Sequence, residues 1–249
     1  PANGITMSIR DNDEAAVLVA AQGVNATEDG QTAVYAIRLA TRPTALLTLL
    51  AQYDEDQIRL DKPVLRFDAN NWSEPQQVTV TAIDDAVDEG PHTVTVVHDA
   101  RSTDGRYNAA PVSPIDVIIE DNDAAGMDVS RTRLLVSENG RTDSYAISLR
   151  SAPTALVTVQ ITGDAQAQAD ALTLFFDPEN WETPQTVTVR AVNDGANETG
   201  PGETHPGVIT HRVTSDDPNY EGFSLPAIAV DILDNDWPST VWLPIVEGL

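Results

Sequence analysis

The sequence has no cysteine, one lysine, few aromatic residues and no long apolar run. Without cysteine, neither a disulfide framework nor thiol chemistry is available. The single lysine is Lys62, which excludes a lysine-dependent crosslink or Schiff base that recurs along the chain. No stretch approaches the roughly 20 consecutive apolar residues of a membrane helix, so we expect no membrane insertion by these residues.

Basic residues are also scarce, with 14 Lys and Arg against 39 Asp and Glu and a formal net charge of −25. Phosphate backbones and anionic membranes attract basic surfaces, so this balance argues against nucleic acid as a partner. Cations are the natural partners of such a chain. With 41% hydrophobic residues, the chain can still build two cores of about 110 residues each.

An internal repeat organises the sequence. The triplet Asp-Asn-Asp occurs at Asp11–Asp13, Asp121–Asp123 and Asp234–Asp236, at intervals of about 110 residues, the size of one ordinary domain. Glu28–Leu46 matches Glu138–Leu156 at 11 of 19 positions. We therefore expect four parts: residues 1–13 as the last strand of a truncated upstream repeat, 14–123 as repeat 1, 124–236 as repeat 2 and 237–249 as a C-terminal tail.

The residue pattern predicts an all-β fold. Polar and apolar residues alternate along Val78–Thr81 and Val187–Val189, β-branched runs recur, and Gly, Pro, Asn and Asp cluster between them. About seven short strands per repeat favour two tandem immunoglobulin-like Greek-key β-sandwiches, with a closed barrel as the alternative. In repeat 2 the strands are expected at residues 132–136, 143–149, 156–161, 172–176, 185–192, 207–215 and 227–233.

Strand direction then predicts where acidic residues gather. If successive strands reverse direction, the first, third, fifth and seventh strands all end at the same pole of a sandwich. The opposite pole receives the loops near Arg42, Trp72 and Tyr107, which are much less acidic. In repeat 1 the acidic exits are Glu28, Asp54–Asp56, Asp84 and Asp85 with Asp88 and Glu89, and Asp121–Asp123.

Clustered carboxylates require a compensating charge. Two of them about 4 Å apart repel by roughly 4 kcal/mol at an effective dielectric near 20. The stretch from Asp84 to Glu89 and the two later triplets contain no basic residue, so a bound cation is the simpler solution. Oxygen ligands from loops, with no histidine or cysteine expected nearby, favour Ca²⁺ over zinc, copper or Mg²⁺.

Several of these motifs resemble the Calx-beta domain family, which occurs in sodium–calcium exchangers and in bacterial surface proteins. The resemblance covers both repeats nearly end to end. It is carried by the first acids in Ala26–Gly30 and Val136–Gly140, the tryptophan segments Asn71–Val80 and Asn180–Val189, and the closing I-x-D-N-D. The tryptophan segments are similar to the bacterial branch.

The resemblance implies an immunoglobulin-like sandwich with Ca²⁺ held at one pole. Because Asn193 stands where repeat 1 has Asp84, and the following loop is longer, we expect the second site to be weaker or remodelled. The implied metal-binding residues are Glu28, Asp84, Asp85, Glu89, Asp121 and Asp123 in repeat 1, and Glu138, Asn193, Asp194, Glu198, Asp234 and Asp236 in repeat 2.

The remaining aromatic and histidine residues have structural interpretations. Trp72 and Trp181 begin alternating strands and are expected to pack in the core. Tyr107 and Tyr220 precede the last strands, and we expect their hydroxyls to bind backbone, as in tyrosine corners. The four histidines, at 92, 98, 205 and 211, lack a nucleophile and an acid at a suitable spacing and are expected to be structural.

The sequence favours a non-enzymatic role. It contains no G-x-S-x-G, H-E-x-x-H, phosphate-loop or dinucleotide-binding motif. We expect calcium ions at the domain junctions to stiffen an extracellular or cell-surface stalk, spacer or adhesion region, because the weak sites of extracellular modules are useful only where calcium is millimolar. Neighbouring repeats would be partners in such a stalk. The alternative is a module that recognises a glycan or a protein on a secreted or surface protein.

Overall fold

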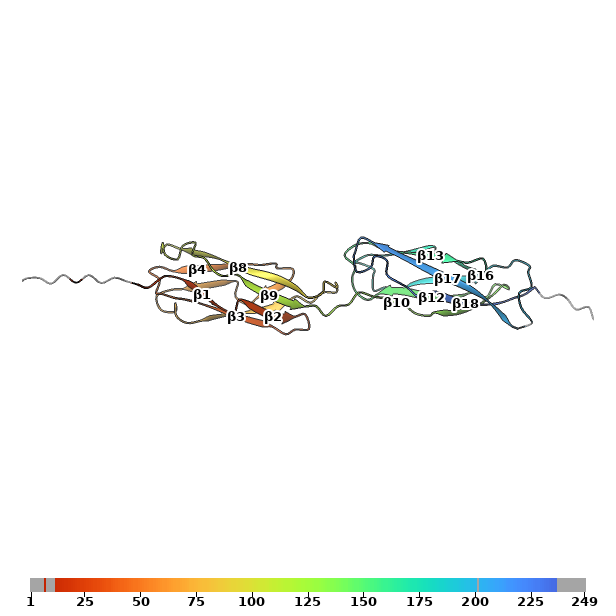
Figure 1. The fold of residues 1–249 in the computed structure, drawn as a ribbon, viewed down its shortest axis with the longest axis horizontal. Coiled ribbons are helices and arrows are strands. Elements are labelled where there is room, and N and C mark those ends of the chain that lie inside the picture. Colours follow the sequence, from red (N-terminus) through yellow and green to blue (C-terminus); the bar gives the residue numbers. More distant parts are fainter. Residues whose placement is uncertain (1–6, 8–11, 201, 237–249) are drawn as a thin grey trace, which may run out of the picture. The chain divides into compact units, whose positions relative to one another are not determined.

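The computed structural model describes Met7, residues 12–200 and residues 202–236. The strand expected over residues 1–13 therefore lies almost wholly outside the described residues, and the tail 237–249 lies outside them entirely. The chain divides into two compact units (Figure 1), unit 1 from Pro1–Asp85 and Glu89–Asn122, and unit 2 from Ala86–Asp88 and Asp123–Leu249. The described residues form strands and loops, with no helix capable of crossing a membrane.

The described residues of unit 1 form nine strands in two sheets. One sheet has four strands in the order β1-β3-β7-β5, and the other has five in the order β2-β9-β8-β4-β6. All pairings are antiparallel except that of β2 with β9, which is parallel. The strands are β1 (Val17–Ala20), β2 (Gly23–Thr27), β3 (Ala33–Leu39), β4 (Leu47–Gln52), β5 (Ile58–Leu60), β6 (Val64–Phe67), β7 (Gln76–Ala82), β8 (His92–Ser102) and β9 (Ile115–Glu120).

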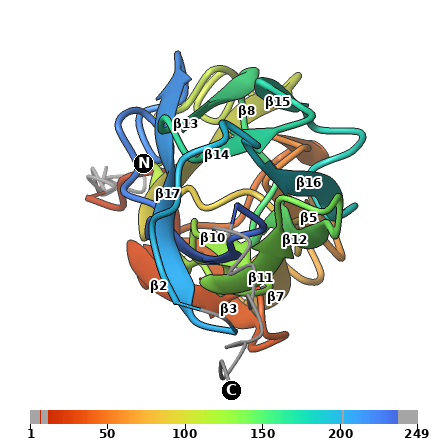
Figure 2. The same ribbon diagram turned by 90° about the vertical axis from the view of Figure 1, so that its right-hand side faces the viewer.

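Unit 2 repeats this topology. Its sheets have the orders β10-β12-β16-β14 and β11-β18-β17-β13-β15, and β11 pairs in parallel with β18. The longest strand, β17, runs beside β13 (Figure 2). The strands are β10 (Met127–Val129), β11 (Arg133–Ser137), β12 (Asp143–Leu149), β13 (Val157–Gly163), β14 (Ala167–Ala169), β15 (Thr173–Phe176), β16 (Gln185–Ala191), β17 (Thr204–Ser215) and β18 (Ile228–Leu233).

Alternating residues of the strands form a separate core in each unit. In β9, Ile115, Val117 and Ile119 are fully buried, while the residues between them face solvent. Full burial of such a side chain contributes about 1.5–3 kcal/mol. Each core is thus built from the inner faces of two sheets, and the all-β prediction is confirmed in an arrangement consistent with immunoglobulin-like sandwiches.

The first strand of unit 1 changes sheets. Strand β1 pairs antiparallel with β3 in one sheet, and after an interval of two residues β2 begins its parallel pairing with β9 in the other. Ala21, between them, has a φ of 69°. This unusual backbone conformation redirects the chain across the edge of the sandwich. As a result β2 and β9 end side by side at the same pole.

The structure has two more strands per unit than the seven expected. All seven strands expected in repeat 2 are present, and β10 and β14 are additional. Both additional strands have three residues, which is too short for alternation to be recognised in the sequence. They complete the edges of the four-stranded sheet.

Tyrosine corners close the less acidic pole, as predicted. The buried hydroxyl of Tyr107 donates to the Thr41 carbonyl at 2.7 Å and accepts from the Thr41 amide at 3.2 Å. In unit 2, the Tyr220 hydroxyl donates to the Ser151 carbonyl at 2.8 Å. In unit 1 these bonds connect the loop between β8 and β9 to the loop after β3. In unit 2 they connect the loop between β17 and β18 to the loop after β12.

We expect Tyr107→Phe to destabilise unit 1 by about 1–2 kcal/mol, because it removes the buried hydroxyl that binds the partly buried backbone groups of Thr41. Tyr53→Phe is the control, since the Tyr53 hydroxyl makes none of these bonds. Hydrogen exchange reports on each unit separately. Exchange in β8 and β9 should accelerate in Tyr107→Phe only, with β17 and β18 unchanged. Equal exchange in both variants would contradict the role of the corner.

A buried tyrosine–histidine pair lies in each unit. In unit 1 the Tyr35 hydroxyl is 3.2 Å from Nε2 of His98, whose Nδ1 is buried without a hydrogen-bond partner. Burial lowers the pKa of His98 to about 4. In unit 2, Tyr145 contacts His211 at 2.8 Å, and Nδ1 of His211 lies 3.1 Å from the Pro226 carbonyl. Burial also lowers the pKa of His211, and the Pro226 carbonyl opposes that shift.

This difference predicts a pH dependence of unit 1. Between pH 6.5 and 4 the unfolded chain binds a proton at His98 and the folded chain does not, so stability falls as the pH falls through this window. His98→Gln should remove about 1–2 kcal/mol of the loss between pH 7.5 and 5, after allowance for solvent screening. His211→Gln should remove a smaller part of the stability loss between pH 7.5 and 5. Urea unfolding at pH 7.5 and pH 5 measures the loss of stability in each variant. An equal loss of unfolding free energy in the wild type and in His98→Gln would refute the assignment.

Candidate metal centre

In unit 1, strand pairing places two acidic residues side by side. Thr27 and Glu120 are partners in the parallel pair β2–β9, and the Glu28 amide donates to the Glu120 carbonyl at 3.1 Å. Glu28 and Asp121 therefore leave the sheet together. The acidic pole predicted from strand direction forms at this end of the unit.

Three carboxylates converge there. One oxygen each of Glu28, Asp121 and Asp123 lies within 4.8 Å of the others. Glu28 is 5% exposed, and burial raises its pKa to about 7. The nearby charges of Asp121 and Asp85 also raise this pKa, whereas the Asn122 amide, 3.4 Å from Oε2, lowers it. The site thus holds a desolvated carboxylate surrounded by charges of the same sign.

The other predicted ligands of repeat 1 surround this group. The Asn122 side-chain amide donates to Asp84 at 3.2 Å and to Asp29 at 3.4 Å. The Glu89 and Gly90 amides both donate to Asp121 Oδ2 at 2.7 Å. Asn122 and these amides were not among the predicted site residues, and they hold the acids in place without neutralising them.

The Glu89 carboxylate has different partners. Its Oε1 accepts from the side-chain amide of Gln57 at 3.0 Å, and its Oε2 lies 3.7 Å from His92 Nε2. The side chain of Glu89 thus contacts Gln57 and His92. The expectation that no histidine lies near the acidic pole is wrong here, because β8 begins at His92 and brings its ring beside Glu89.

Unit 2 has a corresponding acidic group at the ends of β11 and β18. One oxygen each of Glu138, Asp234 and Asp236 lies within 4.8 Å of the others, and the Glu138 amide donates to the Leu233 carbonyl at 3.1 Å. Burial raises the pKa of Glu138, the Asn235 amide opposes the shift, and the charges of Asp234, Glu198 and Asp236 add to it.

Asp234 is held by three backbone amides. It accepts from Asp236 at 2.7 Å, from Glu198 at 2.9 Å and from Thr199 at 3.3 Å. The bond from Asp236, followed by those from Thr199 and Glu198, lowers the pKa of Asp234. It therefore remains negatively charged beside Glu138.

Two predicted ligands of repeat 2 lie differently. The Asn193 side chain donates to the Glu138 carbonyl at 3.4 Å, and Asp194 accepts from the Ala196 amide at 2.9 Å within its own loop. Neither belongs to the groups of described residues whose ligand atoms converge. The expectation of a weaker or remodelled site in repeat 2 stays a prediction.

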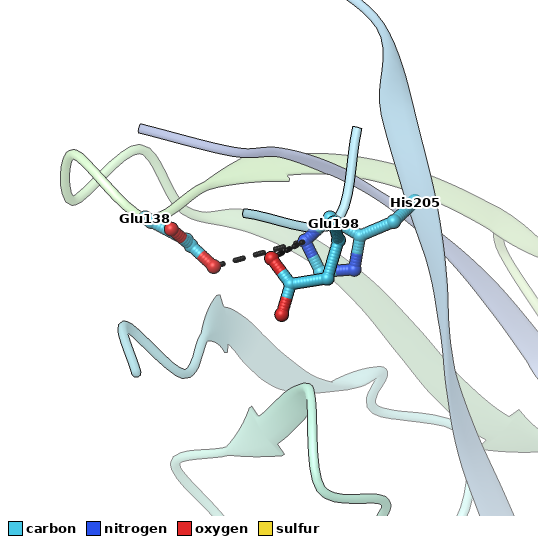
Figure 3. Close-up of side chains that lie close together, drawn as sticks. All are labelled: Glu138, Glu198 and His205. Carbon is cyan, nitrogen blue, oxygen red and sulfur yellow. Dashed lines mark ion pairs between the residues drawn. The ribbon is translucent and has the colours of Figure 1, made fainter. Parts of the chain in front are cut away.

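A histidine occupies the centre of the second site. Nε2 of His205 and one carboxylate oxygen each of Glu138 and Glu198 lie within 4.8 Å of one another (Figure 3). The expectation of an all-oxygen pole is therefore also wrong for unit 2. The strand predicted at 207–215 begins at Thr204, and its alternation turns His205 to the buried face. Extending the alternating pattern by two residues would have revealed this position.

Buried acids at the opposite poles provide a contrast. Asp104 accepts from the Thr44 amide at 2.8 Å and the Arg106 amide at 3.1 Å, and these bonds together with the Arg106 side chain hold its pKa far below the usual range. In unit 2, Asp217 similarly accepts a hydrogen bond from the Thr154 backbone amide at 2.7 Å. Glu28 and Glu138 instead accept from backbone amides only at 3.4 and 3.3 Å and are surrounded by carboxylates, with His205 3.7 Å from Glu138 in unit 2.

No family model matches the chain, and no curated protein matches it. Similar solved structures include CBD12 from CALX1.2, with 13% identity over 87% of this chain and 99% of that one and a TM-score of 0.38. The periplasmic chaperone SfaE has 10% identity over 88% and 100%, with a TM-score of 0.35. The D0–D1 domain of intimin has 15% identity over 86% and 94%, with a TM-score of 0.27. These TM-scores are low, so the proposals below rest on this chain's own residues.

In the metal-free chain at pH 8, Glu28→Gln should stabilise unit 1, because it removes a desolvated charge beside Asp121. We expect about 1–2 kcal/mol, since solvent screening reduces the roughly 4 kcal/mol of two charges 4 Å apart at a dielectric of 20. Glu120→Gln removes the same charge from an exposed position of β9 and is the control. Urea unfolding with a chelator measures both. Destabilisation by Glu28→Gln would contradict uncompensated repulsion.

Proposed function

We propose that this chain is a non-enzymatic calcium-binding module of two tandem immunoglobulin-like Greek-key sandwiches related to Calx-beta domains. The observation that supports calcium best is the convergence of Glu28, Asp121 and Asp123 around a desolvated carboxylate. Two negative charges and a third partly ionised carboxylate call for a divalent ion. The converging donors in unit 1 are all oxygens, which fits Ca²⁺.

The surrounding residues fit a cation site in unit 1. Asp84 and Asp85 lie beside the three converging acids, as the hydrogen bond from Asn122 to Asp84 and the effect of Asp85 on the pKa of Glu28 indicate. Calcium takes six to eight oxygens and tolerates irregular geometry. The backbone amides of Glu89 and Gly90 orient Asp121. When bound, the ion would supply the positive charge that the protein does not provide.

The position of the site connects calcium to mechanics. Asp123 closes repeat 1 and leads directly into repeat 2, so an ion held by Asp121 and Asp123 restrains the connecting segment. A restrained connection would stiffen a tandem array. We propose that the chain serves as a spacer or adhesion region of a larger protein at the cell surface, where millimolar calcium fills sites with a Kd of roughly 10⁻⁴ to 10⁻³ M.

Calcium should stabilise unit 1. At a concentration 100-fold above Kd, binding adds about 2.7 kcal/mol to the free energy of unfolding. Glu28→Gln should lose most of this gain, although it stabilises the metal-free chain, while Glu120→Gln should keep it. Thermal unfolding with calcium, with chelator and with magnesium at equal ionic strength provides the measurement.

Equal stabilisation by magnesium would indicate charge screening in place of a calcium site. Small-angle scattering of the same samples tests the mechanical role. Calcium should narrow the distribution of particle dimensions for wild type and leave Glu28→Gln unchanged. Scattering that is insensitive to calcium in the wild type would remove the stiffening role even if calcium binds.

A further inference from the structure

The histidine in unit 2 faces two carboxylates. His205 Nε2 lies 3.7 Å from Glu138 Oε1 and 3.9 Å from Glu198 Oε2 (Figure 3). The three residues come from different parts of the unit: Glu138 follows β11, Glu198 lies in the loop after β16, and His205 is the second residue of β17. The fold therefore assembles one nitrogen and two oxygen donors around a common point.

These donor atoms are buried and lack hydrogen bonds. The side chain of His205 is 5% exposed, that of Glu138 is fully buried, and that of Glu198 is 20% exposed. Nε2 of His205, Oε1 of Glu138 and Oε2 of Glu198 have no hydrogen-bond partner. Buried polar atoms normally have one, so three such atoms directed at each other indicate a missing ligand.

The equivalent histidine of unit 1 is engaged differently. Nε2 of His92 lies 2.7 Å from Gln57 Oε1, and Nδ1 lies 2.9 Å from the Gly90 carbonyl. Gln57 in turn donates to Glu89 at 3.0 Å. His92 is also more exposed, with 24% of its side chain accessible. Its two nitrogens are thus both occupied by protein atoms.

The corresponding residues of unit 2 do not close this network. Gln166, the counterpart of Gln57, approaches Glu198 only at 3.5 Å, and its own Oε1 is buried without a partner. The segment between Glu198 and His205 is longer than that between Glu89 and His92. In unit 2 the His205 ring faces Glu138 and Glu198, and the Gln166 side chain does not bond to it as Gln57 bonds to His92.

We infer that unit 2 binds a divalent transition-metal ion of the Zn²⁺ class through His205 Nε2, Glu138 and Glu198. Imidazole and carboxylate donors suit such ions, whereas Ca²⁺ takes oxygen ligands. The His205 nitrogen lies 3.7 and 3.9 Å from the two carboxylate oxygens. These separations are larger than those between ligands that each lie about 2.0–2.2 Å from one zinc ion, so binding draws the three side chains together. Glu138 also belongs to the group with Asp234 and Asp236, which links this ion to the rest of the pole.

The test is a zinc titration of the full metal-free chain in millimolar calcium, so that oxygen-only sites are occupied. Calorimetry should show one zinc ion per chain. His205→Gln should weaken zinc binding by at least about tenfold, since even residues that only support a metal ligand contribute 10–100-fold. His92→Gln is the matched control in unit 1 and should leave zinc affinity unchanged.

An NMR measurement on the wild type covers the case in which His205→Gln fails to fold. Zinc should shift the ¹⁵N resonance of one histidine Nε2, assigned to His205 by elimination with His92→Gln, His98→Gln and His211→Gln. The inference is overturned if the wild type binds no zinc, if His205→Gln binds it equally well, or if calcium displaces zinc at comparable concentration. A doubly protonated His205 ring that zinc leaves unaltered would identify an internal counter-ion and also overturn it.

Either proposal, zinc binding or calcium binding, can be refuted without refuting the other. The calcium response depends on Glu28 in unit 1, and zinc binding depends on His205 in unit 2. A chain that responds to calcium but binds no zinc retains the function proposed above. A chain that binds zinc but has no calcium response loses that function and keeps the site in unit 2.

Discussion

The candidate sites of both units depend on a buried glutamate that is surrounded by other carboxylates. Glu28 and Glu138 follow corresponding strands, are almost fully buried and are surrounded by other carboxylates. Elsewhere in the same fold, Asp104 and Asp217 are buried with short bonds from backbone amides. The fold can therefore satisfy buried acids with short backbone hydrogen bonds, and it does not do so for Glu28 and Glu138, whose amide contacts are 3.4 and 3.3 Å.

The parallel pairing of the first and last strands explains where the charge accumulates. Antiparallel neighbours end at opposite poles, whereas β2 and β9, like β11 and β18, end together. The residue after each of these four strands is acidic: Glu28, Asp121, Glu138 and Asp234. The parallel pairing thus brings together, at one pole of each unit, acidic residues that are far apart in the sequence. The two units differ in what approaches that charge, an amide network in unit 1 and His205 in unit 2.

Much of this could be predicted from the sequence because it follows from local patterns. Two-residue alternation located the main strands, and their alternating direction located the acidic pole and the tyrosine corners at Tyr107 and Tyr220. The change of sheet at Ala21 and the three-residue strands left no such pattern. The contacts of Gln57, His92 and Gln166 could not be predicted either, because they depend on loop lengths and side-chain directions of residues distant in sequence. His205 lies outside the strand predicted at 207–215 because β17 begins three residues earlier, at Thr204.

The most direct test of the central claim is a calorimetric titration of calcium into the metal-free full chain, compared between wild type and Glu28→Gln. If the buried carboxylate requires a cation, the wild type will show saturable calcium binding that is retained in excess magnesium, and Glu28→Gln will lose the unit 1 component. Calcium binding of equal affinity and stoichiometry in both proteins, or none in the wild type, would contradict the account.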